Sequence, residues 1–302
     1  MENKKRLNSS DSENQGSFSK KKVLIVFDSN SVIHRAFHAL PPLTTKRGEV
    51  VGAVYGFLLV FLKAIKEFQP DFVAACFDIK GPTFRHEKYE QYKAQRPKAP
   101  DELYLQIPMV KDVLKSFGVP VYEKQGFEGD DLIGTIAKLS PTETIIISGD
   151  SDNLQLIDDK IKVYTLRKGV KDTVLYDEAL VVKKYQGLKP KQLIDYRALR
   201  GDPTDNIPGV KGVGEKTATE LLQRFGTLEN IYKKLDEIKP KTKELLVRSR
   251  EDAFVSKDLA TIIQDVPLDF SLQDCSWDNY DKEKATRAME EFGFHSLIPR
   301  LP

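Results

Sequence analysis

Residues 23–28 read VLIVFD, residues 72–78 read FVAACFD and residues 144–150 read TIIISGD, so three short apolar runs each finish in an aspartate. Each run is nearly continuous in hydrophobicity and is bounded by polar or glycine-containing turns, which is typical of a buried parallel strand. Segments with helical spacing separate them, at residues 50–67, 101–117 and 129–139. Strands alternating with helices predict an α/β fold whose open, mostly parallel, twisted sheet is flanked by helices.

The three strand-ending aspartates are Asp28, Asp78 and Asp150. Ligands of open α/β sheets bind beyond the carboxyl ends of the strands, so all three fall where a site is expected. Any one of them alone is explained as a helix N-cap or a turn former. Three at matching strand ends favour a functional site.

Further carboxylates occur in tight groups. GFEGDDLIGTIA (126–137) supplies Glu128, Asp130 and Asp131, SGDSDNLQLI (148–157) supplies Asp150 and Asp152, and RGDPTDNIPG (200–209) supplies Asp202 and Asp205. Helix capping and the helix dipole explain any single group. Together, however, many ionised carboxylates at one sheet edge repel each other unless cations neutralise them. Oxygen ligands without a histidine or cysteine cluster indicate Mg²⁺ or Mn²⁺, and two such ions roughly 3.5–4 Å apart can promote phosphodiester cleavage.

The net charge of +2 hides an uneven distribution along the chain. Residues 101–182 hold 9 Lys/Arg against 15 Asp/Glu, whereas residues 183–250 hold 16 against 9. An acidic middle beside a basic flank suggests metal ions in one place and a polyanion nearby, although charges that only solvate different faces would look the same. No apolar stretch approaches the roughly 20 residues of a membrane span, and the first 22 residues lack the apolar centre of a signal peptide, so we expect a cytoplasmic protein.

The character of the chain changes near residues 180–190, where strand-like runs give way to Lys-rich helical segments joined by Gly and Pro. We expect a disordered polar tail over residues 1–22, an α/β core over 23–184 and a helical domain over 185–302.

Residues 80–98 combine basic and aromatic side chains, namely Lys80, Phe84, Arg85, Lys88, Tyr89, Tyr92, Lys93, Arg96 and Lys98. This combination suits single-stranded DNA, which pairs its phosphates with cations and stacks its bases on aromatic rings. A solvated amphipathic helix would explain the charges, but not their position directly after a strand that ends in a candidate site residue.

The stretch NIPGVKGVGEKTATELLQRFGTLENIY (206–232) predicts a tight hairpin before a helix. Gly209, Gly212 and Gly214 allow the turn, the helix N-terminus can receive a phosphate, and Lys211 and Lys216 add positive charge. On its own, a Gly-rich helix connection is a weak motif.

With these residues in view, the chain resembles the 5′-nuclease (flap endonuclease-like) family, in particular the N-terminal 5′→3′ exonuclease domain of bacterial DNA polymerase I. The motifs that carry the resemblance are FDSNSVIHRAFHALPPL (27–43), FDIKGPTFRHEKYEQYKAQRP (77–97), GFEGDDLIGT (126–135), SGDSDNLQL (148–156) and YRALRGDPTDNIPGVKGVGEKTA (196–218). The resemblance implies a PIN-like nuclease core and a helix–hairpin–helix (helix–three-turn–helix) element at about 191–235. It also implies two-metal hydrolysis of DNA at 5′ flaps and 5′ ends.

The resemblance also implies roles for individual residues. The first metal would be surrounded by Asp28, Asp78, Glu128 and Asp130, and the second would be held or oriented by Asp131, Asp150, Asp152, Asp202 and Asp205. Residues 80–100 would form a helical arch or clamp in which Arg85 and Lys93 contact the scissile phosphate and Tyr92 and Arg96 grip the strand. Duplex DNA would dock on Gly209, Lys211, Gly212, Gly214 and Lys216, with K⁺ bound by backbone carbonyls near Val210 and Val213. Arg35 and Phe37 would support the DNA path.

Two positions depart from the family pattern. His34 stands where Tyr usually stacks on a base, and imidazole stacks less extensively and can charge near its ordinary pKa of about 6.5. Ser151 stands where a Lys or Arg is frequent, which removes one cation from the acidic site.

The sequence therefore predicts a structure-specific 5′-nuclease that processes replication primers and Okazaki fragments and serves DNA repair. We expect a nucleoid-associated monomer that binds flaps, nicked or gapped duplexes and 5′ ends, and that is fused to or acts with a DNA polymerase. A non-catalytic DNA-structure-binding protein and a PIN-like ribonuclease are the alternatives. The full set of carboxylates disfavours the first alternative, and the hairpin with its basic flank disfavours the second.

Overall fold

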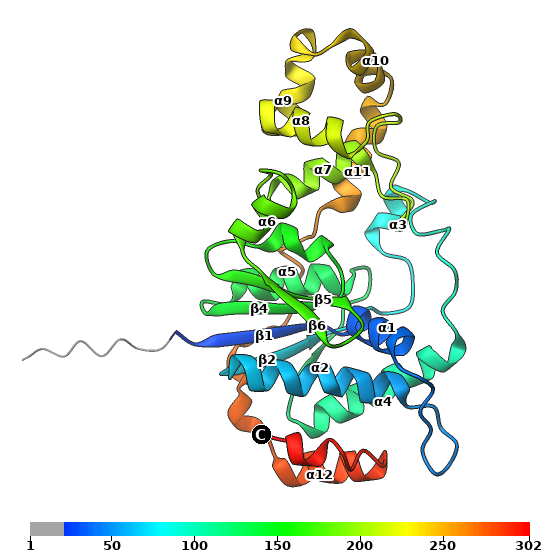
Figure 1. The fold of residues 1–302 in the computed structure, drawn as a ribbon, viewed down its shortest axis with the longest axis vertical. Coiled ribbons are helices and arrows are strands. Elements are labelled where there is room, and N and C mark those ends of the chain that lie inside the picture. Colours follow the sequence, from blue (N-terminus) through cyan, green and yellow to red (C-terminus); the bar gives the residue numbers. More distant parts are fainter. Residues whose placement is uncertain (1–20) are drawn as a thin grey trace, which may run out of the picture.

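The computed structural model describes residues 21–302, so nearly all of the predicted polar tail lies outside the described residues. Its centre is a six-stranded sheet in the order β3-β2-β1-β4-β5-β6 (Figure 1). The strands are β1 (Val23–Asp28), β2 (Phe72–Cys76), β3 (Val121–Tyr122), β4 (Glu143–Ser148), β5 (Ile161–Lys168) and β6 (Asp172–Tyr176). Only β6 runs antiparallel to its neighbour. The predicted mostly parallel α/β sheet is confirmed.

The two faces of β1 are buried under different helices. Ile25 and Phe27 belong to a core formed with α1 (Ser29–Ala39), α2 (Gly52–Phe68) and α4 (Asp101–Ser116). Leu24 and Val26 face the other way, into a core with α5 (Gly129–Leu139). Alternate residues of a strand point to opposite faces, so helices on both sides explain why the strand is apolar throughout.

The strand order decides where the site lies. Strands β2 and β4 flank β1 and run parallel to it, so their carboxyl ends meet at one edge of the sheet. The chain goes from β1 to β2 on one side and later returns to place β4 on the other side. Such a switch of direction leaves a crevice beyond the strand ends, where ligands of open α/β sheets bind.

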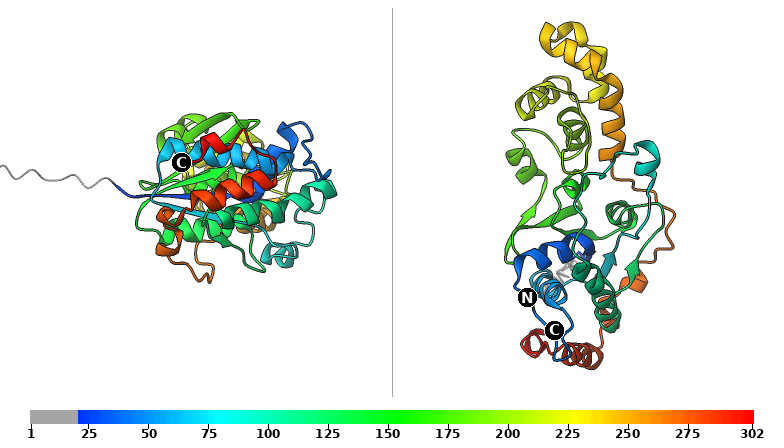
Figure 2. Two further views of the ribbon diagram at one scale, coloured as in Figure 1. Left: turned by 90° about the horizontal axis from the view of Figure 1, so that it is seen from below. Right: turned by 90° about the vertical axis from the view of Figure 1, so that its right-hand side faces the viewer.

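A group of helices with its own core follows the sheet. These are α6 (Glu178–Lys184), α7 (Gln192–Arg200), α8 (Glu215–Phe225), α9 (Leu228–Lys233), α10 (Pro240–Arg248) and α11 (Arg250–Ala260). Buried residues such as Leu199, Leu222 and Ile231 form this second core. The helices α8–α10 extend away from the sheet (Figures 1 and 2). No helix within residues 21–302 is both long enough and apolar enough to cross a membrane.

After α11 the chain returns to the sheet. The backbone of Ser276 bridges to Phe72 of β2, and Ala285 and Met289 of α12 (Lys282–Glu291) are buried in the core that also contains α2 and α4. Figures 1 and 2 show α12 at the end of the molecule opposite α10. The last forty or so residues therefore pack against the sheet and its helices. From the sequence we expected them to belong to the helical domain over residues 185–302.

Candidate active site at the carboxyl edge of the sheet

A cavity of about 430 Å³ lies at the carboxyl edge of the sheet. It is lined by carboxylates from separate parts of the chain, namely Asp28, Asp78, Glu128, Asp130, Asp150, Asp152 and Asp205. The structure thus brings seven of the nine predicted carboxylates to one cavity, whereas Asp131 and Asp202 lie behind it.

Local structure fixes the carboxylates that follow the strands. Asp28 ends β1 and caps α1, where its Oδ1 accepts a hydrogen bond from the backbone N of Ser31 at 3.2 Å. Its Oδ2 accepts from Ser148 Oγ at 2.5 Å. Asp78 accepts from the backbone N of Gly129 at 2.6 Å, so the residue after β2 is tied to the N-terminus of α5. Side-chain oxygens that accept backbone N–H groups at helix starts are favoured by capping and by the helix dipole.

The carboxylates on α5 and after β4 are connected as well. Asp130 lies in the first turn of α5 and accepts a hydrogen bond from Asn153 Nδ2 at 2.8 Å. Asp152 begins a 3-10 helix (Asp152–Leu156), and its backbone N donates to Asp150 Oδ1 at 2.9 Å. Each carboxylate therefore has a partner that limits its side-chain freedom.

The electrostatics of the cavity favour a bound cation. Burial, opposed by hydrogen bonds from Ser148 and Ser31 and assisted by the charges of Asp150 and Asp78, raises the pKa of Asp28 to about 6. Burial and the charges of Asp28, Asp150 and Asp152 also hold the pKa of Asp130 well above its usual range. A positive ion would relieve this repulsion.

The donor set is chemically suited to a hard divalent ion. The acidic lining offers carboxylate oxygens, and Mg²⁺ and Mn²⁺ prefer oxygen ligands. Within residues 21–302, no three or more His, Cys, Asp or Glu side chains already converge as a finished metal site. The carboxylates are gathered at one edge, and their side chains would have to rearrange before three of them could share an ion.

The basic segment after Asp78 covers the cavity. Lys93 Nζ donates to Glu128 at 2.9 Å, Arg96 pairs with Asp205, and the Tyr92 hydroxyl donates to Glu128 at 3.2 Å. Between residues 80 and 100 only α3 (Phe84–Lys88) is helical, and residues 90–96 form turns with Lys93 at a positive φ of 56°. Ion pairs to the carboxylates hold this segment over the cavity. A continuous arch helix does not form within residues 80–100.

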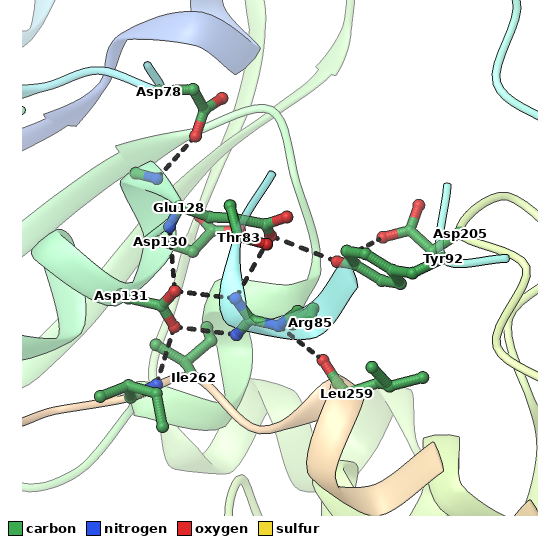
Figure 3. Close-up of polar contacts among 12 residues, drawn as sticks. Asp78, Thr83, Arg85, Tyr92, Glu128, Asp130, Asp131, Asp205, Leu259 and Ile262 are labelled. Atoms are coloured by element: carbon green, nitrogen blue, oxygen red, sulfur yellow. Dashed lines mark hydrogen bonds and ion pairs between the residues drawn. The ribbon is translucent and has the colours of Figure 1, made fainter. Parts of the chain in front are cut away.

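Arg85 is placed differently from Lys93. Its guanidinium forms a two-pronged ion pair with Asp131 and donates to the backbone oxygen of Leu259 (Figure 3). It also donates to the backbone oxygen of Thr261. Asp131 also accepts from the backbone N of Glu128 at 3.0 Å. Arg85 and Asp131 are 2% and 0% exposed; Arg85 lines the cavity, but its guanidinium is engaged by Asp131 and the two backbone oxygens.

The remaining residues of the predicted DNA path differ in their exposure to the cavity. His34 and Arg35 line it, and burial lowers the pKa of His34, as do His38 and Arg96. Arg35 Nη2 donates to the backbone oxygen of Gly149 at 3.0 Å. Phe37 packs against the core under α1 and α2 instead.

The predicted hairpin connects α7 to α8. The backbone N of Gly209 donates to Ser256 Oγ of α11 at 2.9 Å, and Val210 and Val213 are buried. Gly212 approaches Leu245 of α10, where an added Cβ would lie 3.2 Å away. Gly214 precedes α8, and Lys211 and Lys216 are exposed. The basic side chains of the hairpin therefore face solvent while its valines pack inward.

Family models match almost the whole described chain. The model described as "5'-3' exonuclease, N-terminal resolvase-like domain" matches residues 23–186, and "5'-3' exonuclease, C-terminal SAM fold" matches residues 188–283. The chain belongs to the 5′-3′ exonuclease family. The nuclease assignment made from the sequence is thereby confirmed.

Curated relatives of this 5′-3′ exonuclease domain are DNA polymerases. The DNA polymerase I of Caldicellulosiruptor bescii is 43% identical over 283 residues, which are 92% of this chain and 33% of the relative. The DNA polymerase I of Bacillus subtilis is 39% identical over 285 residues, 93% of this chain and 32% of the relative. The chain thus spans about a third of the length of the relatives it matches.

Solved structures share the fold of this exonuclease family member. T5 5′-exonuclease with bound divalent zinc ions has a TM-score of 0.67 at 21% identity, covering 89% of this chain and 99% of that one. The catalytic core of Rad2 in complex with DNA substrate has a TM-score of 0.59 at 19% identity, covering 93% and 94%. Proteins of this fold have therefore been observed with divalent metal ions or with DNA.

Three side chains at the site were not assigned from the sequence. Asn153 and Ser148 donate to Asp130 and Asp28, and Arg197 of α7 pairs with both Asp152 and Asp202. Ser148 and Asn153 flank Asp150 and Asp152 within a quoted motif, so their place near the carboxylates was a usable signal. Arg197 lies 45 residues beyond Asp152, and no local pattern connects the two.

Proposed function

We propose that this chain hydrolyses DNA phosphodiesters at 5′ flaps and 5′ ends, with Mg²⁺ or Mn²⁺ as cofactor. The observation that carries the proposal is the cavity at the carboxyl edge of the sheet, where seven carboxylates lie under the basic residues Lys93 and Arg96. An acidic floor attracts divalent ions and a basic cover attracts phosphates, which together suit phosphoryl chemistry.

The carboxylates divide into two proposed sets. Asp28, Asp78, Glu128 and Asp130 would hold one ion, and Asp150, Asp152 and Asp205 would hold the other, with Asp131 and Asp202 acting from behind through Glu128 and Asp152. When bound, such ions lower the pKa of water and stabilise charge on the leaving oxygen. Serine and asparagine hydrogen bonds to Asp28 and Asp130 keep these oxygens aimed at the cavity.

Lys93 and Arg96, the basic residues over the cavity, are proposed to bind the cleaved strand. Lys93 and Arg96 now pair with Glu128 and Asp205, and a metal ion that takes over these carboxylates would release both cations for phosphate. Lys93 would then stabilise charge that develops on the scissile phosphate. Arg85 is proposed to support Glu128 from below, and His34 to stack on the terminal base.

The helical domain is proposed to bind the duplex through phosphates. Lys211 and Lys216 are exposed beside the N-terminus of α8, and a K⁺ near the carbonyls of Val210 and Val213 would bridge to the backbone of DNA. Contacts of this kind carry little sequence preference and weaken steeply with salt.

We also propose a setting for this activity. A nuclease for 5′ flaps, nicked duplexes and gapped duplexes serves primer processing and repair at the nucleoid, next to a DNA polymerase in the same or another chain. The chain is proposed to act as a monomer, since every carboxylate of the cavity comes from one copy.

A cleavage assay tests the proposal. Labelled 5′-flap DNA, blunt duplex DNA and single-stranded RNA are incubated with the protein, with Mg²⁺ or with a chelator. Mg²⁺-dependent release of the DNA flap is expected, and Asp130→Asn is the inactive control. Preferential RNA cleavage would favour a ribonuclease, and flap binding without cleavage would favour a non-catalytic DNA-binding protein.

A further inference from the structure

Arg197 of α7 reaches from the helical domain to the loop after β4. Its guanidinium pairs with Asp152 of that loop and with Asp202 at the end of α7. We propose that Arg197 is a positioning residue that clamps these two carboxylates together and thereby sets the geometry of the second metal site. The inference rests on the proposed two-metal function and assigns to it a residue outside the predicted set.

The two ion pairs of Arg197 are largely shielded from solvent. The side chain of Arg197 is 15% exposed, and those of Asp152 and Asp202 are 19% and 16% exposed. Ion pairs that are this well shielded are screened much less by salt than surface pairs.

Hydrogen bonds connect both partners of Arg197 to their surroundings. Asp202 Oδ1 accepts from the backbone N of Thr204 at 2.9 Å while its other oxygen faces Arg197. On the opposite side of the clamp, the backbone N of Asp152 donates to Asp150 Oδ1. Arg197 therefore acts on the cavity through Asp152 and Asp150, and it does so from a helix of the other domain.

Ser151 lies beside the ion pairs of Arg197. Ser151 Oγ lies 3.4 Å from Arg197 Nη2, and its small side chain brings no cation of its own to Asp150 and Asp152. A lysine at position 151 would bring a cation to the same carboxylates from within the loop. Loss of Arg197 is therefore expected to be partly repaired by Ser151→Lys, which a purely structural role of α7 would not allow.

Four variants test the clamp: Arg197→Gln, Arg197→Lys, the double variant Ser151→Lys/Arg197→Gln, and Arg287→Gln at an exposed position of α12 as the control. In Arg197→Gln, kcat on flap DNA is expected to fall ~10–100-fold, as when an outer partner of a metal ligand is lost. The Mg²⁺ concentration for half-maximal rate is expected to rise, while KM for DNA changes little. Arg197→Lys is expected to restore little, because an ammonium cannot form the planar two-pronged contact.

Calorimetric titration with Mn²⁺ gives a readout that does not depend on activity. Wild-type protein and Arg287→Gln are expected to bind alike, Arg197→Gln is expected to bind one of the ions more weakly, and the double variant is expected to recover part of this affinity. Equal Mn²⁺ binding by wild-type and Arg197→Gln protein, with equal melting temperatures in chelator, would overturn the clamp. An inactive wild-type protein that still shows the Mn²⁺ difference would contradict the proposed function and leave the clamp supported.

Discussion

Arg85 and Asp131 form a two-pronged ion pair that solvent does not reach. Nη1 and Nη2 of the guanidinium lie 2.7 and 2.8 Å from the two carboxylate oxygens. The other donors of Arg85 reach the backbone oxygens of Leu259 and Thr261 at 2.9 and 2.8 Å. One ion pair thus joins α3, α5 and the end of α11 directly beneath the candidate site (Figure 3).

Removal of the guanidinium is expected to destabilise the protein. Arg85→Met leaves Asp131 buried and unpaired, which costs ~3–5 kcal/mol of unfolding free energy. Urea unfolding of the metal-free protein measures this loss. The double variant Arg85→Met/Asp131→Asn removes both charges and keeps an acceptor for the backbone N of Ile263, so it is expected to recover part of the loss. A double variant that is less stable than Arg85→Met would contradict this account of the pair.

Asp130→Asn, in contrast to Arg85→Met, is expected to leave the stability of the metal-free protein unchanged or to raise it. The pKa of Asp130 is held well above its usual range by burial and by Asp28, Asp150 and Asp152, so its ionised form is destabilised in the metal-free protein. A neutral amide that still accepts from Asn153 removes this repulsion. The metal-free variant should melt at or above the wild-type temperature, while Mg²⁺-dependent cleavage falls at least ~100-fold because a metal ligand is lost. A loss of stability like that of Arg85→Met would show that Asp130 is structural.

The carboxylates after the strands could be located from the sequence for a physical reason. Parallel strands buried on both faces are recognisable as continuous apolar runs, and β2, β1 and β4 lie side by side in the sheet. Glu128 and Asp131, three residues apart on α5, do lie on one side, where both contact Arg85. Which of the two faces the cavity depends on Arg85, which is 46 residues from Asp131. No local periodicity contains that information.

The rest of the fold depends on contacts across long stretches of sequence. Residues 80–100 look like an amphipathic arch, but Lys93 and Arg96 pair with carboxylates of the cavity, and only residues 84–88 of the segment are helical. Helix α12 has an ordinary amphipathic pattern, which predicts a buried stripe but not its partner. Its burial against the core of α2 and α4 depends on tertiary contacts, which hydrophobic spacing alone does not specify.

Two glycines of the hairpin are expected to differ sharply on substitution. Gly209 has a φ of +63°, and an added Cβ would lie 2.3 Å from the backbone N of Gly201. Gly209→Ala therefore costs ~1–3 kcal/mol in backbone strain, to which the steric overlap adds. Gly214 has a φ of −95° and no atom within 4 Å of an added Cβ, so Gly214→Ala costs less than ~1 kcal/mol.

Duplex binding by fluorescence anisotropy and limited proteolysis measure the two hairpin variants. Gly209→Ala is expected to bind duplex DNA more weakly and to be cut faster between α7 and α8, whereas Gly214→Ala retains both properties. Equal behaviour of the two variants would mean that the close packing of Gly209 on Gly201 does not hold the hairpin.

Stabilisation by Mg²⁺ is expected to increase with pH because of Asp28. Burial raises the pKa of this carboxyl from 3.8 to about 6 in the folded protein. Between these values the folded state binds more protons than the unfolded state, so the contribution of Asp28 to stability is present at low pH and is lost as pH rises through about 6. An ion that binds only the ionised carboxylate reverses this loss, and it stabilises the fold by ~2.7 kcal/mol at one hundred times its Kd.

Melting temperatures in Mg²⁺ and in chelator, compared from about pH 5 to about pH 8, measure this linkage. The difference between the two curves should be small at the acid end, grow through the pKa of Asp28 and then level off. His34 is a second titratable group that lines the cavity, so Asp28→Asn is the necessary control: it should flatten the rise while leaving His34 in place. A Mg²⁺ effect that is the same at every pH would show that the ion does not bind the buried carboxylates of the cavity. A rise that persists in Asp28→Asn would assign the titrating group to Asp130 or His34.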